Sequence, residues 1–224
     1  MHDSITVRPL NEADVEAFCA MTQDNQPRFK DAGLASLPTN LDEYTRWLSD
    51  CAAPSPASQT LKLIYGIFAS SDGEENLAGF VGVESLCRFR GAGVWYGLSR
   101  EFHGKGIAKT GVLCAMADFA ERSKRLGLSP PPRWVLHALK RNVSSQNLAT
   151  SIGFKRDEML DYTRSSSSRG GQRFDGFMLK RSGVSLREEA AARVKALAMD
   201  AVMPMPAASN DATHKPTARR RLRA

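Results

Sequence analysis

One stretch near the middle of the chain constrains the fold more than any other, because it joins a strand to a long helix through a glycine turn. Residues 93–99 (GVWYGLS) are apolar and aromatic, as expected of a strand. Farther along, Val112, Met116 and Phe119 recur at helical spacing. Gly127 and a run of prolines then end the helix. Such a unit predicts a sheet that is covered by helices.

The turn within this unit, FHGKG at residues 102–106, is placed to bind an anion. The unpaired N–H groups of the first helical turn point outward there, with the positive end of the helix dipole behind them. Gly104 and Gly106 let a phosphate approach the backbone, and Lys105 adds positive charge. The spacing matches neither the dinucleotide motif nor the P-loop, which argues against NAD and ATP. Taken alone, the turn fits a phosphate cradle and a structural helix entry about equally.

The remaining pattern alternates strands and helices along most of the chain. Asn11 and Asp14 resemble a helix-starting cap, and Ser185 and Glu188 have the spacing of a capping box. Periodicity and turn residues predict strands at 4–10, 60–70, 77–86, 133–140, 158–165 and 172–181, and helices at 11–23, 40–51, 143–154 and 185–201. The polar segment 71–76 is predicted to be a long hairpin tip.

The net charge of +7 over 224 residues is concentrated at the C-terminus. The tail 204–224 is rich in proline, alanine and arginine and has no apolar period, so we expect it to be disordered. Its arginines could contact nucleic acid, but no aromatic residue interleaves with them, which favours a merely solvating tail. We therefore expect a main domain at 1–182, an accessory helix at 183–203 and this basic tail.

Cysteine usage and hydropathy narrow the class of protein further. The four cysteines have no metal-ligand spacing and read as small, reduced hydrophobes: Cys19, Cys51, Cys87 and Cys114. We expect no metal. No segment approaches the roughly 18 apolar residues of a membrane span, and the N-terminus lacks a signal-peptide pattern. A cytoplasmic protein with no membrane partner is the expectation.

A second segment, NVSSQNLATSIGF at residues 142–154, helps to choose between the two interpretations of the glycine turn. It places Asn142 after a strand and Ser145 three residues later. The two segments together resemble the GNAT superfamily of N-acetyltransferases, whose Q/R-x-x-G-x-G/A motif is matched by His103, Gly106 and Ala108. The stretch YGLSREFHGKGIA is similar to the RimJ/RimL branch, which acetylates protein N-termini. The resemblance covers about residues 5–182 and implies an α/β fold with a mixed, mostly antiparallel central sheet flanked by helices.

The resemblance also implies a site for acetyl-CoA between the strands at 93–99 and 133–140, which diverge. The pantetheine arm would pair near Leu98, whose N–H could hold the thioester oxygen, and Asn142 would bind the pantetheine. The pyrophosphate would lie on backbone amides of six consecutive residues: His103, Gly104, Lys105, Gly106, Ile107 and Ala108. Because amides carry this binding, His103 can replace the usual Gln or Arg, and its side chain need do nothing.

The catalytic groups depart from the family pattern. The glutamate common in the RimJ/RimL branch is replaced, because Gly93 and Trp95 stand at its usual places. Glu84, in an apolar run, is the substitute candidate for the base, and an exposed strand-end glutamate is the equally plausible alternative. Asp175 is a lesser candidate. For the thiolate proton, the usual tyrosine position holds alanine.

Ser145 resembles the serine proposed as the proton donor in the RimL-like branch, although a serine there also suits an ordinary helix start. Tyr96 and Tyr162 are alternatives. The acceptor would lie against the first two helices, the segment 25–40 between them, and a basic closing loop with Arg164, Arg169 and Arg173.

We expect a protein N-terminus or peptide as the acceptor. A small amine or amino acid is the alternative, as is a non-catalytic acyl-CoA sensor with a nucleic-acid-binding tail. A monomer and a homodimer both stay open.

Overall fold

A computed structural model of the chain describes residues 4–34, 37–38, 40–52, 60–71, 73–86, 91–164 and 172–202, with the backbone alone for 199–202. The predictions for Cys87, Arg169 and the tail 204–224 lie outside these residues.

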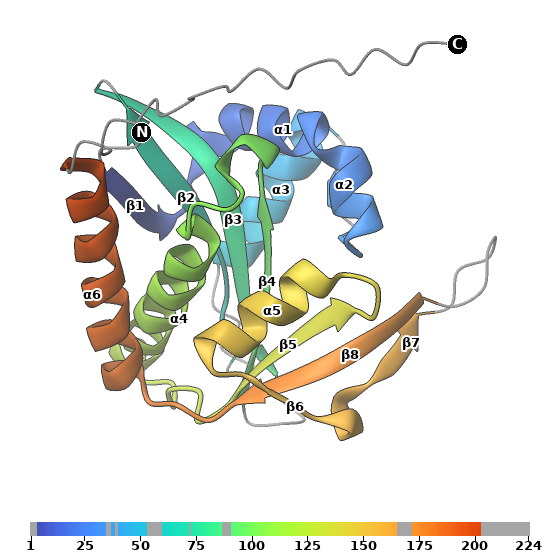
Figure 1. Ribbon diagram of the computed structural model, residues 1–224. Helices are drawn as coiled ribbons and strands as arrows, with labels where there is room; N and C mark the ends of the chain where they lie inside the picture. Colours follow the sequence, from blue (N-terminus) through green and yellow to red (C-terminus); the bar gives the residue numbers. More distant parts are fainter. Residues whose placement is uncertain are drawn as a thin grey trace, which may run out of the picture.

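Within the described residues, eight strands form one mixed sheet in the order β1-β2-β3-β4-β5-β8-β6, with β7 paired to β8 (Figure 1). Only β4 and β5 are parallel among these neighbours. The strands are β1 Ser4–Pro9, β2 Lys62–Ser71, β3 Glu74–Leu86, β4 Gly91–Leu98, β5 Trp134–Leu139, β6 Lys155–Arg156, β7 Tyr162–Arg164 and β8 Gln172–Leu179. The predicted fold class, a mixed and mostly antiparallel sheet flanked by helices, is confirmed.

Helices cover both faces of this sheet (Figure 1). Alternate side chains of each central strand point to opposite faces, so Phe80 of β3 packs with α1 and α3, whereas Val81 packs with α4. The helices of the first face are α1 Val15–Asp24, α2 Gln26–Asp31 and α3 Leu41–Ala52, and those of the second are α4 Ile107–Arg125, α5 Val143–Ile152 and α6 Gly183–Val202. Two separate cores result, one on each face.

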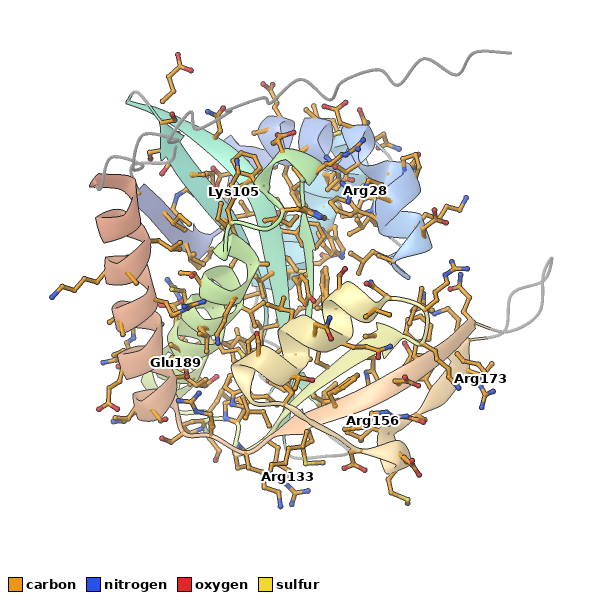
Figure 2. The ribbon with its side chains drawn as sticks, viewed as in Figure 1. Arg28, Lys105, Arg133, Arg156, Arg173 and Glu189 are labelled. Carbon is orange, nitrogen blue, oxygen red and sulfur yellow. The ribbon has the colours of Figure 1, made fainter. Side chains whose placement is uncertain are left out.

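The C-terminal helix α6 packs along α4 and reaches β1 of the same chain (Figure 1). Leu186 is completely buried in the core beneath it. Glu189, which lies beside α4 in Figure 2, has a carboxylate oxygen 3.8 Å from the Nζ atom of Lys109. Farther along, Leu197 lies next to Gly106, at the start of α4. The accessory helix is therefore an integral part of the layer that supports the glycine turn.

Several helix boundaries follow from local capping. Asn11 and Asp14 form the predicted capping box. The Asp14 carboxylate accepts the backbone N–H of Asn11, and the Asn11 side-chain oxygen accepts the backbone N–H of Ala13. At the other end of the chain the predicted cap is wrong. The helix starts at Gly183, and the Ser185 N–H is bonded to the Ser182 hydroxyl at 3.4 Å. Ser182 therefore takes the capping position that the spacing assigned to Ser185.

The structure also corrects three element predictions. The hairpin tip is short rather than long, because β2 and β3 stay paired out to Ser71 and Glu74. The predicted strand 158–165 contains a 3-10 turn, and of its described residues, 158–164, only Tyr162–Arg164 is strand. Between the first two predicted helices lies a further helix, Gln26–Asp31. This last difference matters for function, because α2 lines the cavity described below.

Three cysteines are described, Cys19, Cys51 and Cys114, and each is a free thiol. A search of the described residues finds no cluster of three or more His, Cys, Asp or Glu side chains that could hold a metal ion. In the same part of the chain, no helix has the length and apolar character needed to cross a membrane.

Candidate active site

The two central strands, β4 and β5, separate after a short stretch of pairing. Their parallel register joins residues 92–94 to residues 134–136, yet β4 continues to Leu98 and β5 to Leu139. We call the opening beyond Val94 the fork. It lies where the sequence predicted that these strands diverge.

The backbone of β4 leaves hydrogen-bonding groups on the side of the fork. Ser99 donates its N–H to the Ala78 carbonyl of β3 at 2.9 Å. Because antiparallel strands alternate the direction of these groups, Tyr96 and Leu98 turn their N–H and C=O away from β3 and toward the side of β5. An extended ligand at the fork can therefore pair with β4 as an added strand would.

A cavity of about 960 Å³ opens at the fork, a volume suited to a large ligand. Its wall includes eight of the ten predicted site residues: Leu98, His103, Gly104, Gly106, Ile107, Ala108, Asn142 and Ser145. The structure thus brings together two sequence motifs that are about forty residues apart. Lys105 and Glu84 are not among the lining residues.

The glycine turn has the geometry of an anion cradle. Gly104 and Gly106 have φ of +76° and +74°, in the left-handed region that favours glycine. Gly106 is the N-cap of α4 and supplies no side-chain cap, and the first turn of α4 contains no acidic residue. Its first amides are therefore available to a phosphate, with the helix dipole favouring negative charge.

The side chain of His103 does more than the sequence predicted. Its Nε2 lies 3.1 Å from the Leu98 carbonyl, and its Nδ1 lies 3.4 Å from an Arg28 guanidinium nitrogen. A carbonyl only accepts and a guanidinium only donates, so Nε2 carries the proton and Nδ1 accepts. The imidazole thereby connects α2, which carries Arg28 (Figure 2), to the edge of β4.

Asn142 and Ser145 meet at the start of α5. The Asn142 side-chain oxygen accepts the Ser145 N–H at 3.2 Å, an N-cap bond. The Ser145 hydroxyl lies 2.7 Å from the Tyr96 hydroxyl. Burial raises the pKa of Tyr96 to about 12, so the phenol keeps its proton at neutral pH. A pair of hydroxyl groups that can pass a proton therefore lies in the cavity wall.

Glu84 lies near the end of β3, opposite Gly93 of β4. Its carboxylate is 3.9 Å from the Lys62 ammonium, and its side chain is 41% exposed. Its catalytic role stays a prediction. Lys105 directs its ammonium over the Phe102 ring, 5.5 Å from the centroid, and its contribution to phosphate binding likewise stays a prediction.

Sequence reasoning placed segment 25–40 against the acceptor, and Arg28 and Asp31 of that segment lie in the cavity wall, on α2. It missed Trp95 of β4 and His137 of β5 as residues of this wall. The short helix gave no periodic signal, but His137 did leave one. It is the single polar residue in the apolar run WVLHAL. A polar side chain in a buried strand normally has a hydrogen-bond partner or a functional role, so the sequence marks this histidine as a candidate.

A model of the acetyltransferase (GNAT) domain matches residues 4–155 of the chain. The mixed sheet, its fork and the amide cradle define an N-acetyltransferase that uses acetyl-CoA as the acyl donor. The chain belongs to the GNAT acetyltransferase family, as the two motifs predicted.

Solved structures share this fold at low sequence identity. The microcin C7 self-immunity acetyltransferase MccE, in complex with acetyl-CoA and AMP, is 17% identical with a TM-score of 0.59 and covers 80% of this chain and 93% of its own. RimL, the ribosomal L7/L12 alpha-N-protein acetyltransferase, in complex with coenzyme A, is 16% identical with a TM-score of 0.63 and covers 80% and 96%. Spermidine N-acetyltransferase from Vibrio cholerae, with CoA and spermine, is 18% identical with a TM-score of 0.60 and covers 79% and 95%. A search of curated proteins found no match.

Proposed function

We propose that this protein transfers the acetyl group of acetyl-CoA to the α-amine of a protein N-terminus or peptide. The observation that carries the proposal is the cavity at the fork, in which an amide cradle, a strand edge and a hydroxyl pair occur together. RimL, one of the proteins with this fold, is an alpha-N-protein acetyltransferase. That likeness supports the acceptor class.

The donor side of the cavity fits acetyl-CoA. The first amides of α4 would bind the pyrophosphate, because no acidic side chain of that turn opposes an anion. The backbone groups of Tyr96, which point away from β3, would pair with the amides of the pantetheine arm, and Asn142 would add a side-chain contact. Acetyl-CoA supplies an activated acyl group when bound. The Leu98 N–H would stabilise the negative charge that develops on the thioester oxygen.

The hydroxyl pair of Tyr96 and Ser145 suits the release of the thiol. When the amine attacks and the C–S bond breaks, the thiolate needs a proton. Ser145 would give its proton to the thiolate and regain one from Tyr96. Before this transfer the Tyr96 hydroxyl holds its proton at neutral pH, because burial raises its pKa to about 12. The serine predicted from sequence and the tyrosine kept as its alternative would therefore act as one unit.

The charges of the cavity wall favour a particular kind of acceptor. Among the described lining residues, Arg28, Lys109 and Arg141 are cationic, and Asp31 is the single carboxylate. A polyamine carries several positive charges and needs several carboxylates to bind, so the cationic wall of this cavity would repel it. A peptide contributes one amine at the thioester and neutral backbone groups beyond it, so these cations would not repel the rest of the peptide.

A second candidate acceptor follows from the same arginines. Arg28 and Arg141 are suited to bind a carboxylate, as a small amino acid acceptor would present. The non-catalytic alternative, an acyl-CoA sensor with a nucleic-acid-binding tail, would bind CoA without turnover.

The test is an acceptor panel with isotopically labelled acetyl-CoA, read by mass spectrometry. The panel contains peptides with free N-termini, the same peptides already N-acetylated, single amino acids and spermidine. We expect label on the α-amine of the free peptides and none on their blocked counterparts. Label confined to amino acids or spermidine would replace the proposed acceptor class. Binding of CoA without any label transfer would support the non-catalytic alternative and refute the enzyme.

A further inference from the structure

We propose that His137 is the general base that takes the proton from the acceptor ammonium, an assignment that rests on the proposed transfer to an amine. The sequence placed this role on Glu84, because the carboxylate usual in the RimJ/RimL branch is missing from β4. His137 offers a base on the other strand of the fork. Its position, its hydrogen bond and its surroundings each support the role.

The register of the sheet places His137 at the fork itself. Val94 and Leu136 form the last parallel pair of β4 and β5. The next residues, Trp95 and His137, therefore stand on the two sides of the opening. Trp95 occupies one of the two places where the family's carboxylate was expected, so His137 stands across the fork from the missing group.

Both of these side chains face the layer of α1, α2 and α3. Trp95 packs against Trp47 of α3, with ring centroids 5.8 Å apart. On β5, Leu136 packs in the core beneath α4, and side chains alternate along a strand, so His137 points to the opposite face. Tyr96 packs in the α4 core, on the face away from Trp95. The proposed base and the proposed thiol donor thus lie on opposite faces of the sheet, with the fork between them.

A hydrogen bond fixes which nitrogen of His137 is basic. Nε2 lies 3.0 Å from the Leu160 carbonyl, so it must carry the proton and donate it. Nδ1 then holds the lone pair in the neutral ring. Leu160 can approach β8 this closely because Gly176 lies opposite His137 and lacks a side chain. A Cβ on Gly176 would be 2.3 Å from the Leu160 Cβ.

The surroundings keep the ring neutral at physiological pH. Burial lowers the pKa of His137 from its ordinary value of 6.5, against smaller opposing effects of the Leu160 carbonyl and of Asp161. The Asp161 carboxylate is ion-paired with Arg156 at 2.6 Å, and this pairing limits how far Asp161 can raise the pKa of His137. Tyr162 meets the ring edge-on at 4.9 Å and is itself uncharged.

The charged groups of the cavity wall complete these surroundings. The charged residues of this wall are Arg28, Lys109 and Arg141 together with Asp31, which lies 4.0 Å from Arg141. The three cations oppose protonation of the imidazole, and the single carboxylate favours it.

The proton balance of the step is simple. The acceptor ammonium loses one proton to Nδ1 of His137, and the freed lone pair of its nitrogen forms a bond to the thioester carbon. The C–S bond then breaks, and the thiolate takes a proton from Ser145. The second proton of the nitrogen leaves to water, and a proton from water replaces the one that the Ser145–Tyr96 pair has given up. The products are an amide and a thiol. The imidazolium returns its proton to water.

The experiment compares His137→Gln with the wild type across pH 5.5–9.5, with a peptide acceptor. Glutamine can still donate to the Leu160 carbonyl, but it has no basic nitrogen. The wild type should stay active as the pH falls to the pKa of His137, which lies below 6.5. The variant has no base, so it can use only acceptor molecules whose α-amine is already unprotonated. Since an α-amine has a pKa of about 8, its neutral fraction is about 3% at pH 6.5. The deficit of the variant in kcat/KM should therefore be about 30-fold larger at pH 6.5 than at pH 9.5.

Two controls separate this role from a structural one. Tyr162→Phe keeps the ring beside His137 and should keep the wild-type profile. Glu84→Gln tests the competing base and should also keep it. Nitrogen NMR of the ligand-free protein should show the Nε2-protonated tautomer of His137 and a pKa below 6.5. CoA affinity should be unchanged in all three variants.

Several outcomes would overturn the assignment. A deficit of His137→Gln that is equal at every pH would indicate a structural role, and an unchanged profile would exclude the residue. A profile altered only by Glu84→Gln would move the base to β3, and an Nδ1-protonated ring would remove the lone pair. No transfer by the wild type to any amine would overturn the proposed function as well, whereas transfer with an unaltered His137→Gln profile would overturn the base alone.

Discussion

Replacing Gly106 with alanine tests whether the turn before α4 seats the pyrophosphate. Gly106 has φ of +74°, and a Cβ there would have only an ordinary contact, 3.7 Å from the Leu197 side chain. The cost to folding is therefore the backbone strain of a left-handed alanine, about 1–2 kcal/mol. The strain is relieved if the turn changes conformation, which would re-aim an amide of the cradle. Losing one hydrogen bond to a charged group costs about 1.5–3 kcal/mol. We expect CoA affinity to fall by about 10- to 100-fold.

Gly127 provides a matched control for this variant. It has φ of +73°, lies just beyond the other end of α4, and has open space where a Cβ would be. Gly127→Ala should therefore lower the melting temperature about as much as Gly106→Ala does. Isothermal titration calorimetry of both variants with CoA separates strain from binding. If the two variants lose equal stability and both bind CoA like the wild type, the cradle is not the pyrophosphate site.

Other features of the structure yield three further expectations. Tyr96→Phe should lower kcat by about 10- to 100-fold at unchanged CoA affinity, and adding Ser145→Ala should cost little more in steady-state assays, because the two hydroxyls act as a unit. Leu186→Ala should destabilise the fold by about 2–5 kcal/mol in chemical denaturation, whereas Val184→Ala, at a side chain that is 70% exposed, should change it by less than about 0.5 kcal/mol. Asp14→Asn should destabilise the protein at pH 7. The Arg8 hydrogen bond lowers the pKa of that carboxyl, so its contribution is present above pH 3.8, and the effect of the substitution should shrink as the pH falls through the folded-state value.

The donor half of the site was predictable because its determinants are local. Glycines at 104 and 106, a strand before them and a periodic helix after them specify an amide cradle within about thirty residues. Asn142 and Ser145 are also local, since they start a helix directly after a strand. Motifs of this kind bind through the backbone, so substitutions such as histidine at 103 leave them recognisable.

The other half of the site depends on contacts between distant segments, which the sequence does not display. The role proposed for His137 depends on the strand that lies beside it and on the residue at which the pairing of β4 and β5 stops. Glu84 is a candidate because it interrupts an apolar run, and its catalytic role stays a prediction. The register that pairs it with Lys62 of the neighbouring strand could not be read from the sequence. The helix at 26–31 was missed because six residues, with a proline in the first turn, are too few to show a period.

The fork explains why the sequence predicts the acyl donor but not the acceptor. Donor-side groups lie on α4, α5 and the edge of β4, where amides and hydroxyls can bind one invariant molecule. In the proposed function, the acceptor would contact α2, Trp95 and His137 on the opposite face, where side chains would select its charge and shape. Because the sheet separates the two faces, a residue such as Asp31 can change without disturbing the cradle, whereas Arg28 contacts His103 of the glycine turn. Acceptor specificity should therefore follow substitutions on α2, and charge reversal at Asp31 should alter acceptor preference more than CoA affinity.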